Sequence, residues 1–184
     1  MKSFRLPFKY FIKEDFFSAE NYHLLKEFGS KILWEFFNDP NFPQYISPRN
    51  DVENFFLHNN DSASKFRFLF EHNFIKELEH LFEITLKTCA SILYHKLTKG
   101  CFNIVHNDSN TFGEKIRIIC YLSAPADYQG GDLNLFEESN LEKPVQSYKF
   151  QENSAFLFAM TDNSFHSVSE VTQGDRICIV ITFK

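Results

Sequence analysis

The spacing of apolar residues changes at Gly100, and this change constrains the fold more than any other feature of the chain. Before Gly100, apolar residues recur at the spacing of amphipathic helices, and after it they alternate in short runs between turn-forming residues. Short strands at regular spacing are typical of a β-sandwich or a double-sheet jelly roll. No linker separates the halves, so the 184 residues predict one α+β, mainly β domain with N-terminal helices packed on one sheet.

The N-terminal part predicts a helical support over about residues 1–95. Alternating apolar residues predict an opening strand over 8–12. One helix is expected over about 18–37, capped by the serine at its start, and a second over about 73–94. The polar residues of 38–63 are rich in turn formers and predict an irregular loop. The apolar stripe of the second helix predicts a buried, core-facing surface and consists of Phe74, Leu78, Leu81, Phe82, Thr85, Cys89 and Ile92.

The C-terminal part, about residues 96–184, predicts the β core. Short apolar runs there are bounded by clusters of Gly, Pro, Asn, Asp and Ser, which favour turns. We expect strands at about 101–107, 116–123, 132–136, 146–150, 154–160, 166–171 and 176–183.

Composition indicates a folded protein and excludes some partners. Hydrophobic residues make up 43% and charged residues 23%, and the net charge is −5. An acidic balance without a basic stripe argues against binding to nucleic acid or to an anionic membrane. No stretch approaches the roughly 20 apolar residues that cross a bilayer. The four cysteines are scattered without a CxxC pair, which favours reduced thiols, so we expect a cytoplasmic protein.

One short segment carries the spacing of a metal site. His106 and Asp108 are two residues apart near the end of an expected strand, so their side chains share one face. His166 starts a later strand and fits as a third ligand. Two imidazoles and a carboxylate form the facial triad of non-haem Fe(II) chemistry. The other histidines have no acidic residue two positions later, and we interpret them as surface or core residues: His23, His58, His72, His80 and His95.

Arg176 begins an alternating strand and is expected to point into the β unit. A buried guanidinium needs an anion, because an uncompensated buried charge is costly. The anion is either a structural partner, Asp132 or Glu170, or the carboxylate of a ligand held by a bidentate clamp. Tyr121 is either a core residue or a hydroxyl donor to the same carboxylate.

These residues resemble the 2-oxoglutarate/Fe(II)-dependent dioxygenases, and the closest resemblance is to the prolyl 4-hydroxylase-like branch. It covers residues 100–183 and rests on several separated elements in the family's order. Besides His106-x-Asp108, these are Tyr121-Leu122, Gly130-Gly131-Asp132-Leu133, Phe156-Leu157-Phe158, His166-Ser167-Val168 and Val171-x-x-Gly174-x-Arg176. The chain departs from the family at Ser123, at 151–154 and at Lys96, where Asn, a Pro and Gly pair, and Tyr are common.

The resemblance implies a double-stranded β-helix and an oxygenase site. Its cofactors would be Fe(II), 2-oxoglutarate and O2, with ascorbate as a candidate reductant. His106, Asp108 and His166 would bind the iron. The far carboxylate of 2-oxoglutarate would be anchored by Arg176 and Tyr121, in a pocket lined by Ile119, Leu133 and Val180.

The substrate is less constrained than the site. Asp108 argues against a halogenase, which lacks the carboxylate ligand, and Thr182 against the nucleic-acid demethylases, which carry a second Arg at that place. The favoured hypothesis is hydroxylation of a prolyl residue in a protein or peptide. Hydroxylation of a free amino acid or small natural product is the alternative. A non-catalytic jelly-roll module that binds a metal or a small acid is the alternative from another class. Residues 38–63 and 137–144 are either substrate-contacting segments or solvated connections.

Overall fold

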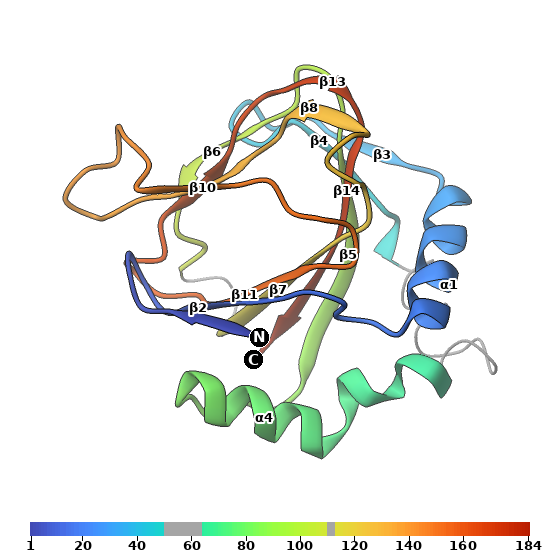
Figure 1. The fold of residues 1–184 in the computed structure, drawn as a ribbon, viewed down its shortest axis with the longest axis vertical. Coiled ribbons are helices and arrows are strands. Elements are labelled where there is room, and N and C mark those ends of the chain that lie inside the picture. The colour runs from blue at the N-terminus through green and yellow to red at the C-terminus, as the bar shows by residue number, and fades with distance from the viewer. Residues whose placement is uncertain (50–63, 110–112) are drawn as a thin grey trace.

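The protein is an antiparallel β structure with helices on one side (Figure 1). The computed structural model describes residues 1–49, 64–109 and 113–184. Its helical elements are α1 (Ala19–Ser30), the 3-10 helix η2 (Arg67–Phe70) and α4 (His72–Phe82). Its strands are β1 (Lys2–Phe4), β2 (Tyr10–Lys13), β3 (Glu35–Phe37), β4 (Gln44–Ile46), β5 (Cys89–Leu97), β6 (Asn103–His106), β7 (Ile116–Tyr121), β8 (Tyr128–Gly130), β9 (Leu133–Leu135), β10 (Gln146–Tyr148), β11 (Ala155–Ala159), β12 (His166–Val168), β13 (Val171–Gly174) and β14 (Arg176–Phe183).

Two sheets dominate the architecture. The larger sheet has eight strands in the order β1-β2-β11-β7-β14-β5-β4-β3, and the smaller has four in the order β10-β9-β12-β6. A third, two-stranded sheet joins β13 to β8. Neighbours along the large sheet come from distant parts of the sequence, so the N-terminal strands complete a sheet whose centre is built by β7 and β14.

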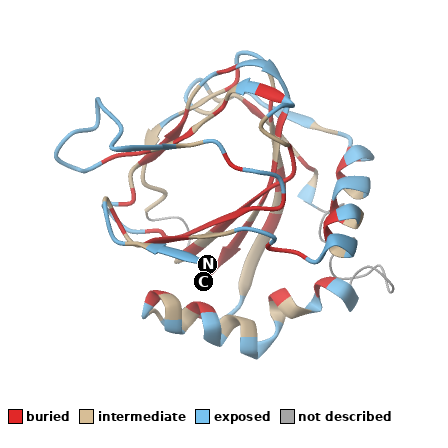
Figure 2. Cartoon of the chain, viewed as in Figure 1, coloured by how far each residue is buried: buried red, intermediate tan, exposed pale blue. Residues whose placement is uncertain are grey.

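The two faces of the large sheet bury different cores, because its side chains alternate along each strand. On β7, Ile118 and Cys120 face the helices, whereas Ile119 and Tyr121 face the small sheet. The helix-side core includes Leu25 of α1. Figure 2 shows the buried positions concentrated in the central strands, with exposed residues on the outer faces of the helices.

The predicted helices begin correctly but end too late. Ser18 caps α1 by accepting a hydrogen bond from the Asn21 backbone N–H, as expected, but the helix stops at Ser30 and β3 follows. The second helix stops at Phe82, where Glu83 takes a left-handed φ of 60°. The prediction of helix over 83–94 is therefore wrong: residues 83–88 form an irregular connection, and β5 begins at Cys89.

The expected strands of the C-terminal part are confirmed as β6, β7, β9, β10, β11, β12 and β14, with shorter bounds. The run predicted as one strand over 166–171 divides into β12 and the start of β13. β8 was not predicted. The irregular loop expected over 38–63 contains β4, which is a correction, and its residues 50–63 lie outside the described part of the chain. Among the described residues, no helix is long and apolar enough to span a bilayer.

Candidate metal centre

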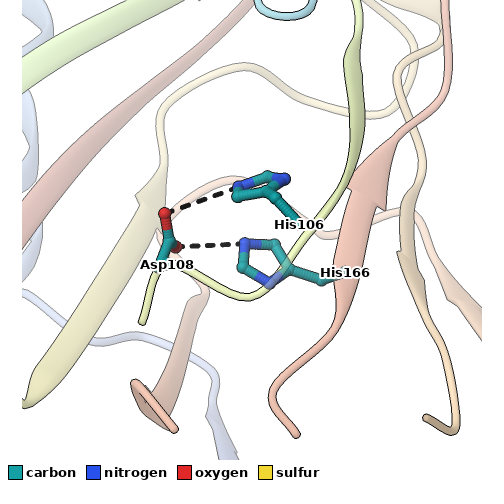
Figure 3. Close-up of side chains that lie close together, drawn as sticks. All are labelled: His106, Asp108 and His166. Carbon is teal, nitrogen blue, oxygen red and sulfur yellow. Dashed lines mark ion pairs between the residues drawn. The ribbon is translucent and has the colours of Figure 1, made fainter. Parts of the chain in front are cut away.

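Three side chains that are distant in sequence meet at one end of the small sheet. His106 ends β6 and His166 begins β12, and the two residues are paired directly across these strands. Asp108 follows β6 by two residues. Its Oδ1 lies 3.5 Å from His106 Nε2 and its Oδ2 lies 3.3 Å from His166 Nε2. Figure 3 shows the two rings and the carboxylate pointing toward one another. Among the described residues this is the one group that could hold a metal ion, with ligand atoms within 4.8 Å of one another.

Both imidazoles are oriented by backbone carbonyls. The Nδ1 atom of His106 donates to the carbonyl of Ile104 at 2.8 Å, and that of His166 donates to the carbonyl of Ser164 at 2.8 Å. A carbonyl only accepts, so Nδ1 carries the hydrogen and the lone pair of Nε2 faces the shared space. Ligands of protein-bound metals are commonly oriented in this way. The donor set therefore fits a divalent transition metal.

A pair of hydrogen bonds joins the turn that contains Asp108 to the turn that precedes His166. The Asn107 side-chain amide donates to the carbonyl of Asp162 at 2.9 Å. The Ser164 hydroxyl donates to the carbonyl of Asn107 at 2.8 Å. These bonds join the turn after β6 to the turn before β12, which brings Asp108 beside His166.

The protonation states favour a cation. Burial, and then the neighbouring His166, lower the pKa of His106 to about 4. Burial opposes ionisation of Asp108, but His166 and the Arg117 guanidinium outweigh it and hold the pKa of that carboxyl well below its usual value. Near neutral pH the site therefore offers an uncharged His106 imidazole and a carboxylate, the forms that bind metal.

A cavity of about 230 Å³ adjoins the three residues and lies between the two sheets. Arg176 lines it, as do the three apolar residues expected there, Ile119, Leu133 and Val180. Tyr121 contacts Arg176 but is not among the lining residues. The full lining is Phe37, Phe42, Gln44, His95, Leu97, Asn103, His106, Asp108, Arg117, Ile119, Leu133, His166, Val168, Arg176, Cys178 and Val180.

Arg176 is a buried cation that faces this cavity, with only 2% of its surface exposed. Its Nη2 donates to the Tyr121 hydroxyl at 3.3 Å, and the guanidinium lies 5.0 Å from the centre of that ring. Among the described residues, Nε has no hydrogen-bond partner and no carboxylate forms an ion pair with the guanidinium. The structural pairing with Asp132 or Glu170 is therefore absent from the described part of the chain, and the cavity fits an anion at this end.

Comparison with known families identifies the chain. A family model described as the 2OG-Fe(II) oxygenase superfamily matches residues 92–184. The chain belongs to the 2OG-Fe(II) oxygenase superfamily. It is therefore a 2-oxoglutarate-dependent oxygenase, and its cofactors are Fe(II), 2-oxoglutarate and O2. A search of curated proteins found no match.

Solved structures share the fold of this oxygenase at low sequence identity. An oxidoreductase of the 2OG-Fe(II) oxygenase family from Burkholderia pseudomallei is 10% identical, with a TM-score of 0.72, over 95% of this chain and 85% of that one. A prolyl hydroxylase from Trichoplax adhaerens, solved with a hypoxia inducible factor peptide, is 15% identical, with a TM-score of 0.68, over 95% and 82%. A prolyl-4-hydroxylase from Pseudomonas putida is 13% identical, with a TM-score of 0.61, over 95% and 91%.

Sequence reasoning missed several residues of the oxygenase cavity. Arg117 forms a 2.6 Å ion pair with Asp108, and its alternation with Ile119 and Tyr121 along one strand face could have revealed it. His95 is not among the possible metal ligands, as expected, but it lines the cavity, which the sequence did not indicate, and its Nδ1 lies 3.0 Å from Gln44 Oε1. Because a helix was expected up to about residue 94, the sequence did not predict that His95 lies on a strand that faces the cavity. Nothing in the sequence indicated a role for Gln44.

Proposed function

We propose that the chain is a single-domain hydroxylase of an unactivated C–H bond, acting on a prolyl residue in a protein or peptide. The proposal includes a double-stranded β-helix over its β core. One observation carries it: the group His106, Asp108 and His166 opens onto the same cavity as Arg176, a buried cation without a carboxylate partner among the described residues. A metal-binding end and an anion-binding end in one cavity match the two ends of 2-oxoglutarate.

The roles follow from this arrangement. His106 and His166 would bind Fe(II) through Nε2, and Asp108 through its carboxylate. Arg176, backed by the Tyr121 hydroxyl, would hold the far carboxylate of 2-oxoglutarate. When bound, iron and 2-oxoglutarate supply the oxidising chemistry, in which 2-oxoglutarate gives succinate and CO2 and one oxygen atom goes to the substrate. No protein group is required as a general acid or base.

Ile119, Leu133 and Val180 would flank the carbon chain of 2-oxoglutarate between the two charged ends. These three side chains come from β7, β9 and β14, so both sheets contribute to the wall. An apolar wall keeps water away from the reacting centre and strengthens the ionic contacts at either end.

The size of the cavity supports a small reacting group. At about 230 Å³ it is smaller than the roughly 300–1,000 Å³ of pockets that enclose drug-sized ligands. Once 2-oxoglutarate is bound, the remaining space suits one side chain presented from outside or one small molecule. A prolyl ring meets this limit, and the peptide bound to the Trichoplax adhaerens prolyl hydroxylase supports a peptide substrate. A free amino acid or small natural product is the alternative substrate.

Turnover of 2-oxoglutarate tests the proposal. Protein loaded with Fe(II), 2-oxoglutarate and ascorbate should form succinate, and His106→Ala and Asp108→Ala should abolish it. Equal succinate formation by the wild type and both variants would contradict the proposal and favour a non-catalytic binding module. Mass spectrometry of prolyl peptides and of free amino acids incubated with the enzyme should then find one added oxygen atom. Oxygen added to the amino acids alone would replace the peptide assignment.

A further inference from the structure

The three proposed metal ligands are each held by a second group, and for Asp108 that group is Arg117. The two imidazoles donate to backbone carbonyls, as described above. Asp108 Oδ2 lies 2.6 Å from Arg117 Nη1 in an ion pair. We propose that Arg117 is a positioning residue that fixes the Asp108 carboxylate for metal binding. This inference rests on the proposed metal site.

Asp108 needs such support more than the two histidines do. His106 and His166 lie within strands β6 and β12, whose pairing fixes their backbones. Asp108 lies beyond β6, with a φ of 59°, in the left-handed region that a non-glycine residue seldom adopts. A ligand carried by a turn has more freedom to rotate than one carried by a strand. A side-chain contact from a rigid element limits this freedom and holds the carboxylate in place.

Arg117 is well placed to be that rigid contact. It lies on β7, which pairs with β11 on one side and β14 on the other, near the centre of the large sheet. Its side chain is only 19% exposed and lines the cavity together with Asp108. The contact joins the large sheet to the turn that follows β6 of the small sheet. It therefore fixes the position of the Asp108 carboxylate relative to the large sheet.

Glu114 compensates the positive charge of Arg117, which lies beside the proposed metal site. A guanidinium near Fe(II) would by itself repel the ion. Glu114 Oε2 lies 3.4 Å from Arg117 Nη2, with its side chain 18% exposed. Asp108, Arg117 and Glu114 together carry one net negative charge, the same as Asp108 alone. The trio therefore orients the ligand carboxylate without adding positive charge to the site.

Metal affinity measured without turnover tests this role. Mn(II) is titrated into the metal-free protein and the unbound ion is followed by electron paramagnetic resonance. Arg117→Met should weaken Mn(II) binding by roughly 10- to 100-fold, the usual cost of losing a group that orients a ligand. Arg117→Lys should recover part of the affinity, because the ammonium keeps the charge but not the planar fork. Glu114→Gln should also weaken binding, since the charge of Arg117 is then uncompensated.

A matched control separates orientation from general damage. Arg5→Met removes an exposed guanidinium that does not line the cavity and should leave Mn(II) affinity unchanged. Thermal unfolding in chelator identifies variants that do not fold. If Arg117→Met does not fold, the Mn(II) affinity of Arg117→Lys is compared with that of the wild type instead. Unchanged or tighter Mn(II) binding by a folded Arg117 variant would overturn the inference alone. Absence of Mn(II) binding by the wild type would overturn the proposed function and this inference with it.

Discussion

Arg176 places a full positive charge where water has almost no access, and the structure gives it a phenol and a thiol as neighbours. Neither group neutralises a guanidinium. The proposed carboxylate of 2-oxoglutarate would do so, and Arg176→Met should then lose roughly 2–5 kcal/mol of 2-oxoglutarate binding, the cost of breaking a desolvated charge pair. Calorimetric titration of the Mn(II)-loaded protein measures it. The exposed Arg5→Met is the control and should bind normally. Equal affinities in both variants would make Arg176 a structural residue.

His95 and His106 should make the metal-free protein sensitive to mild acid. Burial lowers the pKa of each from 6.5 to about 4, so between these values the unfolded chain binds more protons than the folded one. Stability should be complete above pH 6.5 and fall as the pH drops toward about 4. Asp108 does not contribute in this window. The pKa of its carboxyl is lowered from its usual 3.8, so its protonation reduces stability only in more acidic solution.

Urea unfolding in chelator at several pH values measures this dependence. His95→Gln removes one of the two titrating groups and should give a shallower pH profile than the wild type. Parallel profiles would show that His95 titrates normally in the folded protein.

At the scale of elements, sequence predicted strands and the site better than helix ends. The alternation around Arg176 and the His106-x-Asp108 spacing are local signals, and they placed β14 and two proposed ligands. The prediction of helix over 83–94 failed because Thr85, Cys89 and Ile92 also recur at a helical spacing. From Cys89 onward the structure is decided by the pairing of β5 with β14, a strand that is distant in the sequence. Long-range pairing of this kind leaves little trace in local spacing.

The turn between β8 and β9 should control the position of Arg176. Gly131 has a φ of 67°, and a Cβ there would lie 2.9 Å from Arg176 Cδ and 3.1 Å from Val171 Cγ2. Gly131→Ala should therefore destabilise the fold by about 1–2 kcal/mol for the left-handed backbone. It should also displace Arg176 and weaken 2-oxoglutarate binding.

Gly100→Ala is the matched control for this turn. Its φ is 87°, but a Cβ there meets nothing within 4 Å. It should cost similar stability and leave 2-oxoglutarate affinity unchanged, as measured by urea unfolding and by titration of the Mn(II)-loaded protein. A loss of affinity in both variants would mean that backbone strain, not contact with Arg176, is responsible.

At the scale of the whole molecule, the large sheet separates two cores with different tasks. The helix-side core contains Leu25 and Leu78 and does not reach the cavity. The core between the sheets contains Leu133 and Leu135, and Leu135 pairs directly with His166 across β9 and β12. The helices therefore stabilise the sheet from behind, whereas the inner core sets the geometry of the site.

Two equal substitutions distinguish these tasks. Leu78 and Leu135 are 1% and 0% exposed, so Leu78→Ala and Leu135→Ala should each cost about 2–5 kcal/mol of unfolding free energy. Only Leu135→Ala should also weaken Mn(II) binding by the folded protein, because the cavity that it leaves lies against the strand that carries His166. Urea unfolding and Mn(II) titration at a temperature where both variants are folded give the two quantities. If Leu78→Ala weakened Mn(II) binding equally, the helix layer would help to position the ligands, and the large sheet would not isolate the site from the helices.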